Sequence, residues 1–536
     1  MPRANRPKLA PAPATDVRTT DADADAGADR RLRIQQRLAL VLILLVAAGA
    51  RLYRIDEQSL WLDEIWTIEA ATGRGSTHLR LPHGEIVTQP VALTSFNDAA
   101  AWWHARETTH PPVFQLSFRV WINAFGTSEL AVRGLPAAAS VIAVYLLYLI
   151  VRQLHGTAGP ALWAALIMAV APSQVQFAQE TRPYPLMTMV SLAAAWAIVS
   201  FVRGGPNPWR LVAFATALLV MMLTHYFLAG VATALVAYGF LRTRGVARRN
   251  LLIAVAIAAA VFVLAWGPSM WAQRAAFADE NTDFLNDEGP GRVLRTFARV
   301  AALPPRLFTE FLGGKVLPAI LLGGIVLFAA WRARRRDDLL LWCLWLAGAV
   351  GLIALVDLTR STRHLHFLRY TLVAAPALYA IAATLLWPAG GIARHLLPGV
   401  VMLTCAVILP AAPLTMWKAN WRDLAPLMAD QSRPGDILGI APSDDDLTYP
   451  RNAYLCLSHY APEPLVPFVL LQEKADERLL QQLKDAPGVL LLMPLDAIVS
   501  PYADVLGECH AEPLAAAVGA GRLWRITWTP QRPPAE

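Results

Sequence analysis

Two adjacent acids, Asp63 and Glu64, lie in a segment that follows the first strongly apolar run of the chain. Carboxylates at the edge of a membrane are costly unless they face water, a partner or a substrate. A carboxylate just outside the bilayer could take a proton from an acceptor hydroxyl while that hydroxyl attacks a lipid-linked substrate. Asp63 and Glu64 are therefore the first candidates for catalytic residues.

Further residues that could do chemistry lie near the ends of apolar runs. The membrane orientation argued below predicts that they lie on the same side of the membrane as the acidic pair. They are His110, Glu180, Arg182, Tyr184, His225, Arg369 and Tyr370. Arg182 and Arg369 could hold a phosphate, because a guanidinium group stays charged and forks onto oxygens. Glu180 and His225, with His110, could bind a divalent metal, although no close spacing supports such a site.

Each of these residues also has an ordinary explanation. A histidine near the end of a span is often an interface residue with a satisfied hydrogen bond. A single arginine can meet lipid headgroups, and tyrosine at that level belongs to the aromatic belt. Their convergence on one side favours a functional site.

The composition is that of a polytopic membrane protein. Hydrophobic residues make up 56% of the 536 residues and charged residues only 16%, whereas soluble proteins carry about 25% charged residues. The net charge of +7 is spread over short loops between apolar runs, which indicates membrane orientation and not nucleic-acid binding. The four cysteines show no zinc-ligand spacing, and the absence of a phosphate-binding Gly-Lys loop argues against an ATP-driven pump.

The apolar runs predict eleven membrane-spanning helices. They cover 38–53, 130–151, 161–177, 184–202, 211–224, 225–241, 251–270, 316–331, 339–356, 370–387 and 396–414. Residues 110–126 could be a further span or an amphipathic helix. If they do not cross, the arginine-rich loops at 242–249 and 332–336 fall on the cytoplasmic side with the N-terminus, as the positive-inside rule requires. We therefore expect a large outer loop, 54–129, with amphipathic helices.

Two segments outside the predicted spans have a distinctive composition. Residues 1–34, rich in Pro, Ala and Asp, are expected to form a disordered cytoplasmic tail before a transmembrane domain at 35–414. Residues 292–312 alternate arginine with apolar residues, which predicts an interfacial amphipathic helix.

The region 415–536 is expected to form a small α/β domain outside the membrane. Four short apolar runs predict buried strands, and 475–486 predicts a helix between two of them. Cys456 and Cys509 both lie here, in a compartment that would be oxidising, so a disulfide between them is one hypothesis, although the geometry is unknown.

The order of the motifs resembles that of the GT-C membrane glycosyltransferases, in the branch that holds protein O-mannosyltransferases and the bacterial lipid A aminoarabinose transferase. The resemblance covers about residues 35–410. The motifs are Trp-Leu-Asp-Glu64, His110-Pro-Pro-x-Phe, Phe-Gly-x-Ser-Glu-x-Ala-x-Arg133, Gln-Glu-x-Arg-x-Tyr184, Thr-His-Tyr226 and Arg-Tyr370.

This resemblance implies an inverting enzyme that moves a pentose or hexose from a polyprenyl phosphate to a hydroxyl of a lipid, glycan or protein. Asp63 would be the catalytic carboxylate, supported by Glu64. His110 stands where relatives often have a lysine facing the lipid phosphate, and would need protonation to do that work. Arg369 would be a second phosphate or sugar contact. Thr109 stands where metal-dependent relatives have a glutamate, so the resemblance does not decide whether this protein uses a divalent metal.

The basic cluster Arg30, Arg31, Arg33 and Arg37 before the first span predicts a cytoplasmic N-terminus, and with eleven spans the C-terminal domain is then in the periplasm. The expected location is the bacterial inner membrane. The alternative function is a transporter or flippase of lipid-linked saccharides. Transporters usually show internal repeats and charged or broken helices near the bilayer midplane, and no such repeat is evident here. A third hypothesis is an inactive scaffold that binds partners through its outer domain.

Overall fold

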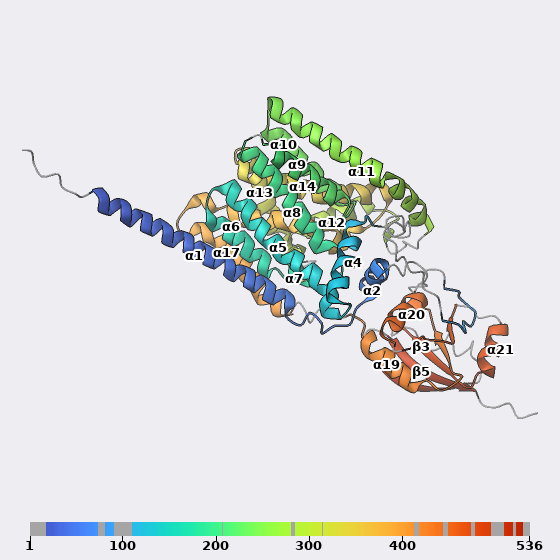
Figure 1. The fold of residues 1–536 in the computed structure, drawn as a ribbon. Coiled ribbons are helices and arrows are strands. Elements are labelled where there is room, and N and C mark those ends of the chain that lie inside the picture. Colours follow the sequence, from blue (N-terminus) through green and yellow to red (C-terminus); the bar gives the residue numbers. More distant parts are fainter. Residues whose placement is uncertain are drawn as a thin grey trace, which may run out of the picture.

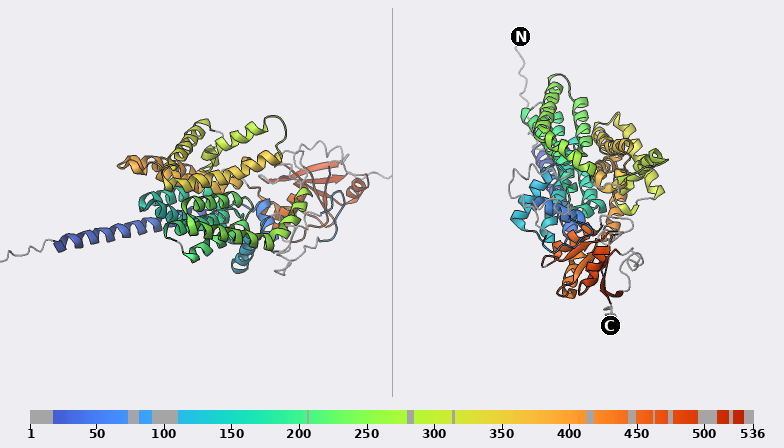
Figure 2. Two further views of the ribbon diagram at one scale, coloured as in Figure 1. Left: turned by 90° about the horizontal axis from the view of Figure 1, so that it is seen from above. Right: turned by 90° about the vertical axis from the view of Figure 1, so that its right-hand side faces the viewer.

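The computed structural model shows a bundle of helices with a small sheet unit at one end (Figure 1). It describes residues 18–72, 81–90, 110–205, 207–279, 285–312, 315–411, 418–442, 449–461, 463–472, 477–494, 509–517 and 521–528. A second view, turned by 90°, shows the sheet unit again at the end of the bundle (Figure 2). The predicted class, a polytopic helical protein with a small C-terminal sheet unit, is confirmed.

Seven helices in the described residues are long and apolar enough to cross a membrane, and one bent pair adds an eighth. The seven lie within α1 (Arg18–Leu52), α5 (Glu129–His155), α8 (Tyr184–Arg203), α11 (Gly245–Asp279), α13 (Val316–Ala333), α14 (Asp337–Arg360) and the run Leu368–Ala389, which holds α15 (Leu368–Thr371) and α16 (Ala375–Thr384). Three shorter apolar helices are α9 (Pro208–Met222), α10 (Leu228–Arg242) and α17 (Ala393–Ile408). Together they correspond one by one to the predicted apolar segments.

The shorter helices α9 and α10 differ from full spans. Each has 15 residues, which at about 1.5 Å per residue is shorter than a hydrocarbon core of about 30 Å. The segments predicted at 211–224 and 225–241 are therefore helices, but not of full spanning length. The turn between them carries His225.

The span predicted at 161–177 is not one straight helix. It is broken into α6 (Ala158–Val170) and α7 (Pro172–Ala178), which meet at an angle of 56°. The break falls before Pro172, which has no N–H to continue the hydrogen-bond ladder. This corrects the sequence prediction, and proline chemistry explains it.

The N-terminal helix begins earlier than predicted. We expected residues 1–34 to be disordered, but α1 starts at Arg18; residues 1–17 lie outside the described residues. The Asp-Ala repeat explains the difference, because alanine is the best helix former and aspartates near a helix N-terminus favour its dipole.

The segment between α1 and α5 carries two helices that shape the site. α2 (Leu62–Thr72) begins next to Asp63, and α4 (Val113–Phe125) packs against both α2 and α5. Phe114, Phe118 and Ile122 of α4 are buried at helical spacing. With 13 residues, α4 is too short to cross a bilayer, in agreement with its assignment to the loop.

Helix α12 (Arg292–Arg306) matches the predicted amphipathic segment. Its arginines face the protein: Arg295 and Arg299 both pair with Asp287 at 2.6 Å. Its apolar residues Leu294 and Phe297 are exposed instead. A helix that turns its apolar side outward in this way is suited to lie against lipid.

The C-terminal unit is a five-stranded sheet in the order β2-β1-β3-β5-β4. Its strands are β1 (Ile437–Ile440), β2 (Phe468–Leu470), β3 (Val489–Met493), β4 (Cys509–Ala517) and β5 (Gly521–Trp528), and its helices are α19 (Trp421–Gln431), α20 (Tyr449–Tyr460) and α21 (Glu477–Asp485). The first three strands are parallel, while β5 and β4 are antiparallel to their neighbours. The four predicted strands and the predicted helix are present, whereas β4 was not predicted. Short 3-10 helices elsewhere are η3 (Glu310–Leu312), η4 (His364–His366), η5 (Leu372–Ala374), η6 (Trp387–Ala389) and η7 (Leu409–Ala411).

The hypothesis of a disulfide between Cys456 and Cys509 is wrong, because both are free thiols in the structure. Alternate residues of the central strands point to opposite faces of the sheet. Cys456 packs with Leu490 in one hydrophobic cluster, whereas Cys509 packs against the cluster that contains Leu491. The two sulfur atoms therefore belong to opposite faces.

Candidate functional site

Asp63 lies in the first turn of α2, where the helix dipole favours a negative charge. Its Oδ2 is 3.2 Å from Nη1 of Arg369 and 3.7 Å from Nη2 of Arg182. Among the described residues, none donates a hydrogen bond to its Oδ1. The side chain is 17% exposed. The carboxylate is thus fixed through one oxygen, and the other is left for a hydroxyl.

The two arginines are themselves held in place. Arg182 donates from Nη1 to the main-chain oxygen of Asp63 at 3.1 Å and to Oγ1 of Thr67 at 3.2 Å. Its guanidinium lies 5.9 Å from the ring centre of Tyr184, and that of Arg369 lies 5.2 Å from the ring centre of Tyr370. These are cation–π distances. The predicted phosphate-binding arginines and tyrosines therefore come together around Asp63.

Each arginine keeps a donor that the protein does not use. The Nε atoms of Arg182 and Arg369 are buried and have no hydrogen-bond partner in the structure. Burial lowers the pKa of Arg182, but the adjacent Asp63 carboxylate outweighs burial and raises it, so this guanidinium remains charged. Because a buried unsatisfied donor is costly, two such donors beside one carboxylate indicate a binding site for an anion.

Glu64 points away from this site and is fully buried. Arg133 donates two hydrogen bonds to its carboxylate, of 2.8 and 2.9 Å. The amide of Thr181 and Nζ of Lys418 each donate one more at 2.9 Å. Burial alone would raise the pKa of Glu64, but Lys418 and Arg133 lower it to about 2. Both carboxylate oxygens of Glu64 are therefore occupied by donors from the protein.

Arg133 connects Glu64 to the loop before α2. Its Nη1 donates to the main-chain oxygens of Ile55 and Gln58, both at 2.7 Å, and its Nη2 donates to that of Ser59 at 3.1 Å. One buried arginine of α5 therefore fixes the loop that leads into the helix bearing Asp63.

The motif at 179–184 distributes its side chains over several partners. Gln179 donates to the main-chain oxygen of Tyr53 at 2.8 Å, at the end of α1. Thr181 and Arg182 contact the acidic pair, as described above. Glu180 is buried, and burial raises its pKa to about 7, although Lys418 nearby acts in the opposite direction.

His110 and His225 lie beside the arginines with their ring centres 5.3 Å apart. Burial, followed by the nearby Arg182 and Arg369, lowers the pKa of His110 to about 3. Burial and the neighbouring His110 lower the pKa of His225 well below its ordinary value. A lowered pKa disfavours the protonation that His110 would need to act as a cation on a phosphate.

The residues suggested for a divalent metal are not gathered into a cluster of ligands within the described ranges. In the part of the chain that the structure describes, no group of three or more His, Cys, Asp or Glu side chains could hold an ion. Thr109, which bears on the same question, lies outside the described residues.

A buried acid of α14 organises the turn that precedes Arg369. Asp357 accepts hydrogen bonds from the Thr362 hydroxyl at 2.8 Å and from the amides of His364 and Leu365 at 2.8 and 2.9 Å. The His364 ring lies 5.2 Å from that of Tyr370. Asp357 therefore ties together the turn that leads to the second arginine beside Asp63.

The charges around Asp63 do not balance. Asp63 and Glu64 supply two negative charges and Glu180, whose pKa burial raises to about 7, supplies at most a third, whereas the cationic groups in contact with the acidic pair are Arg133, Arg182, Arg369 and Lys418. The surplus of positive charge, in a poorly solvated place, suits a phosphate group.

Comparison with known proteins identifies the fold. Residues 109–266 match the family model described as dolichyl-phosphate-mannose-protein mannosyltransferase. The crystal structure of ArnT from Cupriavidus metallidurans in the apo state is similar with a TM-score of 0.56 at 16% identity, over 92% of this chain and 99% of that chain. This chain has a GT-C fold. The resemblance to GT-C glycosyltransferases that the motifs predicted is confirmed.

Other GT-C structures are more distant. ArnT from Cupriavidus metallidurans bound to undecaprenyl phosphate has a TM-score of 0.46 at 16% identity, over 92% of this chain and 99% of that one. The Archaeoglobus fulgidus oligosaccharyltransferase in the apo form has a TM-score of 0.45 at 13% identity, over 81% of this chain and 65% of that one. A search of curated protein sequences finds no match.

Two residues of this candidate site were not assigned from the sequence. Arg133 was part of a quoted motif, but a single arginine within an apolar run gives no sign of its partner. Lys418 belongs to none of the motifs above, although lysine is rare in this chain. Its separation of 354 residues from Glu64 puts the contact beyond any local pattern.

Proposed function

We propose that this protein is an inverting glycosyltransferase that moves a pentose or hexose from a polyprenyl-phosphate donor to a hydroxyl acceptor on the periplasmic face of the bacterial inner membrane. The acceptor is a lipid, a glycan or a protein. The observation that carries the proposal is the position of Asp63 between Arg369 at 3.2 Å and Arg182 at 3.7 Å, with both guanidinium groups retaining a buried unpaired Nε.

The proposed reaction is a single displacement at the anomeric carbon. The acceptor hydroxyl donates its proton to Asp63 while its oxygen forms the new bond to the sugar. The bond between the anomeric carbon and the phosphate oxygen breaks, and its electron pair stays on the phosphate. Attack from the side opposite the leaving group inverts the configuration.

Arg182 and Arg369 serve the leaving group in this reaction. The donor phosphodiester carries one negative charge, and release of the sugar leaves a phosphate monoester with more. Fixed cations stabilise charge that develops in the transition state without reorganisation. In support, the ArnT with the same fold has also been solved bound to undecaprenyl phosphate.

One observation favours the alternative, a flippase of lipid-linked saccharides. The broken helix pair α6–α7 resembles the discontinuous helices that transporters use to bind substrates. However, the carbonyl oxygens of Met168 and Ala169 before the break accept hydrogen bonds from buried Arg51. They are thus occupied by protein and not presented to a transported group, and we retain the enzyme.

The test is donor turnover by purified protein with a panel of polyprenyl-phosphate sugars. Wild type should release polyprenyl phosphate from at least one donor, and Asp63→Asn should lower kcat by about 10²- to 10⁴-fold, because the amide cannot accept the proton. Binding of polyprenyl phosphate should persist in the variant, since both arginines remain.

Asp56→Asn is the matched control, because Asp56 is an exposed acid of the same loop and should turn over like wild type. Wild-type turnover by Asp63→Asn would remove Asp63 from the reaction. Movement of intact donor across liposomes without sugar release would support the flippase.

A further inference from the structure

We infer that the C-terminal sheet unit acts as a clamp on the Asp63 helix, and that Lys418 is the positioning residue through which it sets the catalytic geometry. This inference rests on the proposed function for its kinetic consequence. Its structural basis is independent of the reaction, because the sheet unit contacts α2 on one face and the loops on both sides of it.

The first contact is an ion pair. Lys418 enters from the segment before α19 and places Nζ 2.9 Å from Oε2 of Glu64. Its side chain is 7% exposed and that of Glu64 is fully buried. A buried carboxylate next to Asp63 on the same helix therefore has a counter-ion from a distant part of the chain. Without Lys418, Glu64 would keep Arg133 as its counter-ion but lose one of its buried donors, and such a loss is costly.

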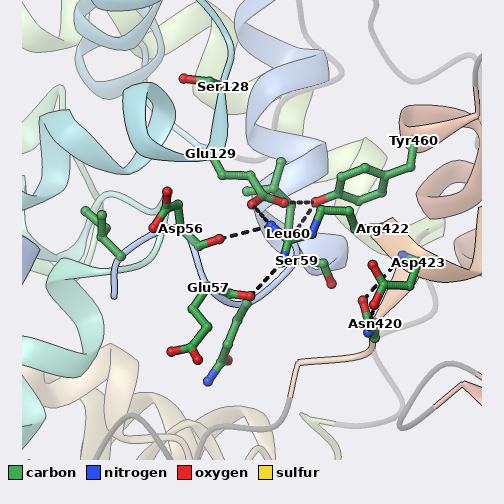
Figure 3. A network of polar contacts seen from close by, with 12 residues as sticks. Asp56, Glu57, Ser59, Leu60, Ser128, Glu129, Asn420, Arg422, Asp423 and Tyr460 are labelled. Atoms are coloured by element: carbon green, nitrogen blue, oxygen red, sulfur yellow. Dashed lines mark hydrogen bonds and ion pairs between the residues drawn. The ribbon is translucent and has the colours of Figure 1, made fainter. Parts of the chain in front are cut away.

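A network of polar contacts extends this junction (Figure 3). Tyr460 of α20 donates to Glu129 of α5 at 2.5 Å and accepts from the amide of Leu60 at 2.6 Å. Arg422 of α19 pairs with the same Glu129 and donates to the main-chain oxygen of Glu57 at 2.7 Å. The loop before α2 is therefore tied at several points to the two helices that cover the sheet.

The body of α2 packs against the same helices. Ile65, Ile68 and Ala71 are buried and lie on one face of α2 at helical spacing. They belong to one hydrophobic cluster with Trp421 of α19 and Leu457 of α20. The sheet unit thus supplies part of the core that holds the catalytic helix.

The loop that follows α2 is held by the sheet edge. The amide of Gly84 donates to the Leu470 oxygen at 2.8 Å, and Val87 exchanges two main-chain hydrogen bonds of 2.8 and 3.0 Å with Phe468. Residues 83–87 thereby cover the edge of β2, which would otherwise expose unpaired groups. The chain on both sides of α2 is anchored on one unit.

The consequence concerns precision at Asp63. The distance from Asp63 to Arg369 depends on how α2 sits against the transmembrane helices, and the clamp holds α2 from the other side. A displacement of about 1 Å in a catalytic group can cost about 10²-fold in rate. Loss of Lys418 should therefore affect turnover more than donor binding, since neither arginine would be lost.

The experiment compares full-length Lys418→Met, Lys418→Arg and Arg525→Met with wild type. Arg525 is the matched control, because it is a buried cation paired with buried Asp436 at 3.0 Å inside the sheet unit, away from α2. Two readouts are used: kcat and KM for the donor, and hydrogen exchange of the amides in 62–72.

We expect Lys418→Met to lower kcat by about 10²-fold with KM within about twofold of wild type, and to speed amide exchange in 62–72. Lys418→Arg, which keeps the charge, should recover at least about tenfold of the lost kcat. Arg525→Met should leave exchange in 62–72 as in wild type.

Wild-type kcat and exchange in Lys418→Met would overturn the clamp, as would equal effects in Arg525→Met, since those would indicate general unfolding of the sheet unit. Absence of turnover by wild type with every donor would overturn the proposed function instead. Exchange in 62–72 would still decide the clamp in that case.

Discussion

Asp63 and Glu64 are neighbours in sequence but occupy different environments. Successive residues of a helix point about 100° apart, so one faces Arg182 and Arg369 while the other faces Arg133 and Lys418. One carboxylate keeps an oxygen for a substrate, and the other is enclosed by donors. An acidic pair can therefore divide into a reacting acid and a supporting acid through helix geometry alone.

Glu180 provides a prediction about pH. Its pKa rises from 4.5 to about 7 in the folded protein because of burial. Between these values the folded state holds a proton that the unfolded state has released, so stability falls as pH rises through this window. Relative to Glu180→Gln, the free energy of unfolding of wild type should fall by up to about 3 kcal/mol as pH rises through this window. The measurement is unfolding in detergent across pH 4.5 to 7.

Glu310→Gln is the control for this series, because the Glu310 side chain is exposed. Replacing it changes the charge by the same amount without removing a buried group. If the difference between wild type and Glu180→Gln stays constant over the window, the environment assigned to Glu180 is wrong.

At the scale of elements, the break between α6 and α7 shows how a polar group stabilises an irregular span. Carbonyl oxygens at a helix end lack partners inside their own helix, and the bilayer core offers no water. Arg51 of α1 donates to those of Ala169 and Met168 at 2.9 and 3.1 Å, and to Oγ of Ser140 at 2.7 Å. A basic residue inside a span thus serves as a cap for another helix.

Arg51→Met should destabilise the protein markedly, because it leaves the oxygens of Met168 and Ala169 buried without donors. Each such loss costs about 1–3 kcal/mol. The stability of Arg51→Lys should lie between those of wild type and Arg51→Met, since a single ammonium group cannot reproduce the several hydrogen bonds of the guanidinium group. The measurement is thermal unfolding in detergent.

Arg334→Met is the comparison for Arg51→Met, because Arg334 is exposed in the loop between α13 and α14. It should unfold like wild type. An equal melting temperature for Arg51→Met and wild type would show that the capping contacts contribute nothing to stability.

At the scale of the whole molecule, α1 and the sheet unit define two ends. The N-terminal part of α1 extends from the bundle on the side away from the sheet (Figures 1 and 2). The arginines at 332–336 adjoin the connection between two spans. The positive-inside rule leads us to propose that this connection is cytoplasmic and the sheet unit periplasmic.

Cysteine labelling in intact cells tests this orientation. Glu477 in α21 and Arg334 are both exposed, so a cysteine at either position can react with a membrane-impermeant maleimide once reached. We expect Glu477→Cys to be labelled in cells with a permeable outer membrane, and Arg334→Cys only after the inner membrane is opened. The reverse pattern would invert the topology, and the four native thiols set the background in wild type.

The sequence by itself determined the membrane class, the apolar segments, four of the strands and the residues around Asp63, because hydrophobic periods and short motifs are local. It did not determine the break before Pro172, the free state of Cys456, the lowered pKa of His110 or the partner of Lys418. Each of these depends on what lies against the residue: Lys418 meets Glu64 across 354 positions, and the pKa of His110 is lowered by burial and by two arginines that are distant in sequence. Tertiary structure decided them, since burial and charge neighbours are set by packing between segments and not by any segment alone.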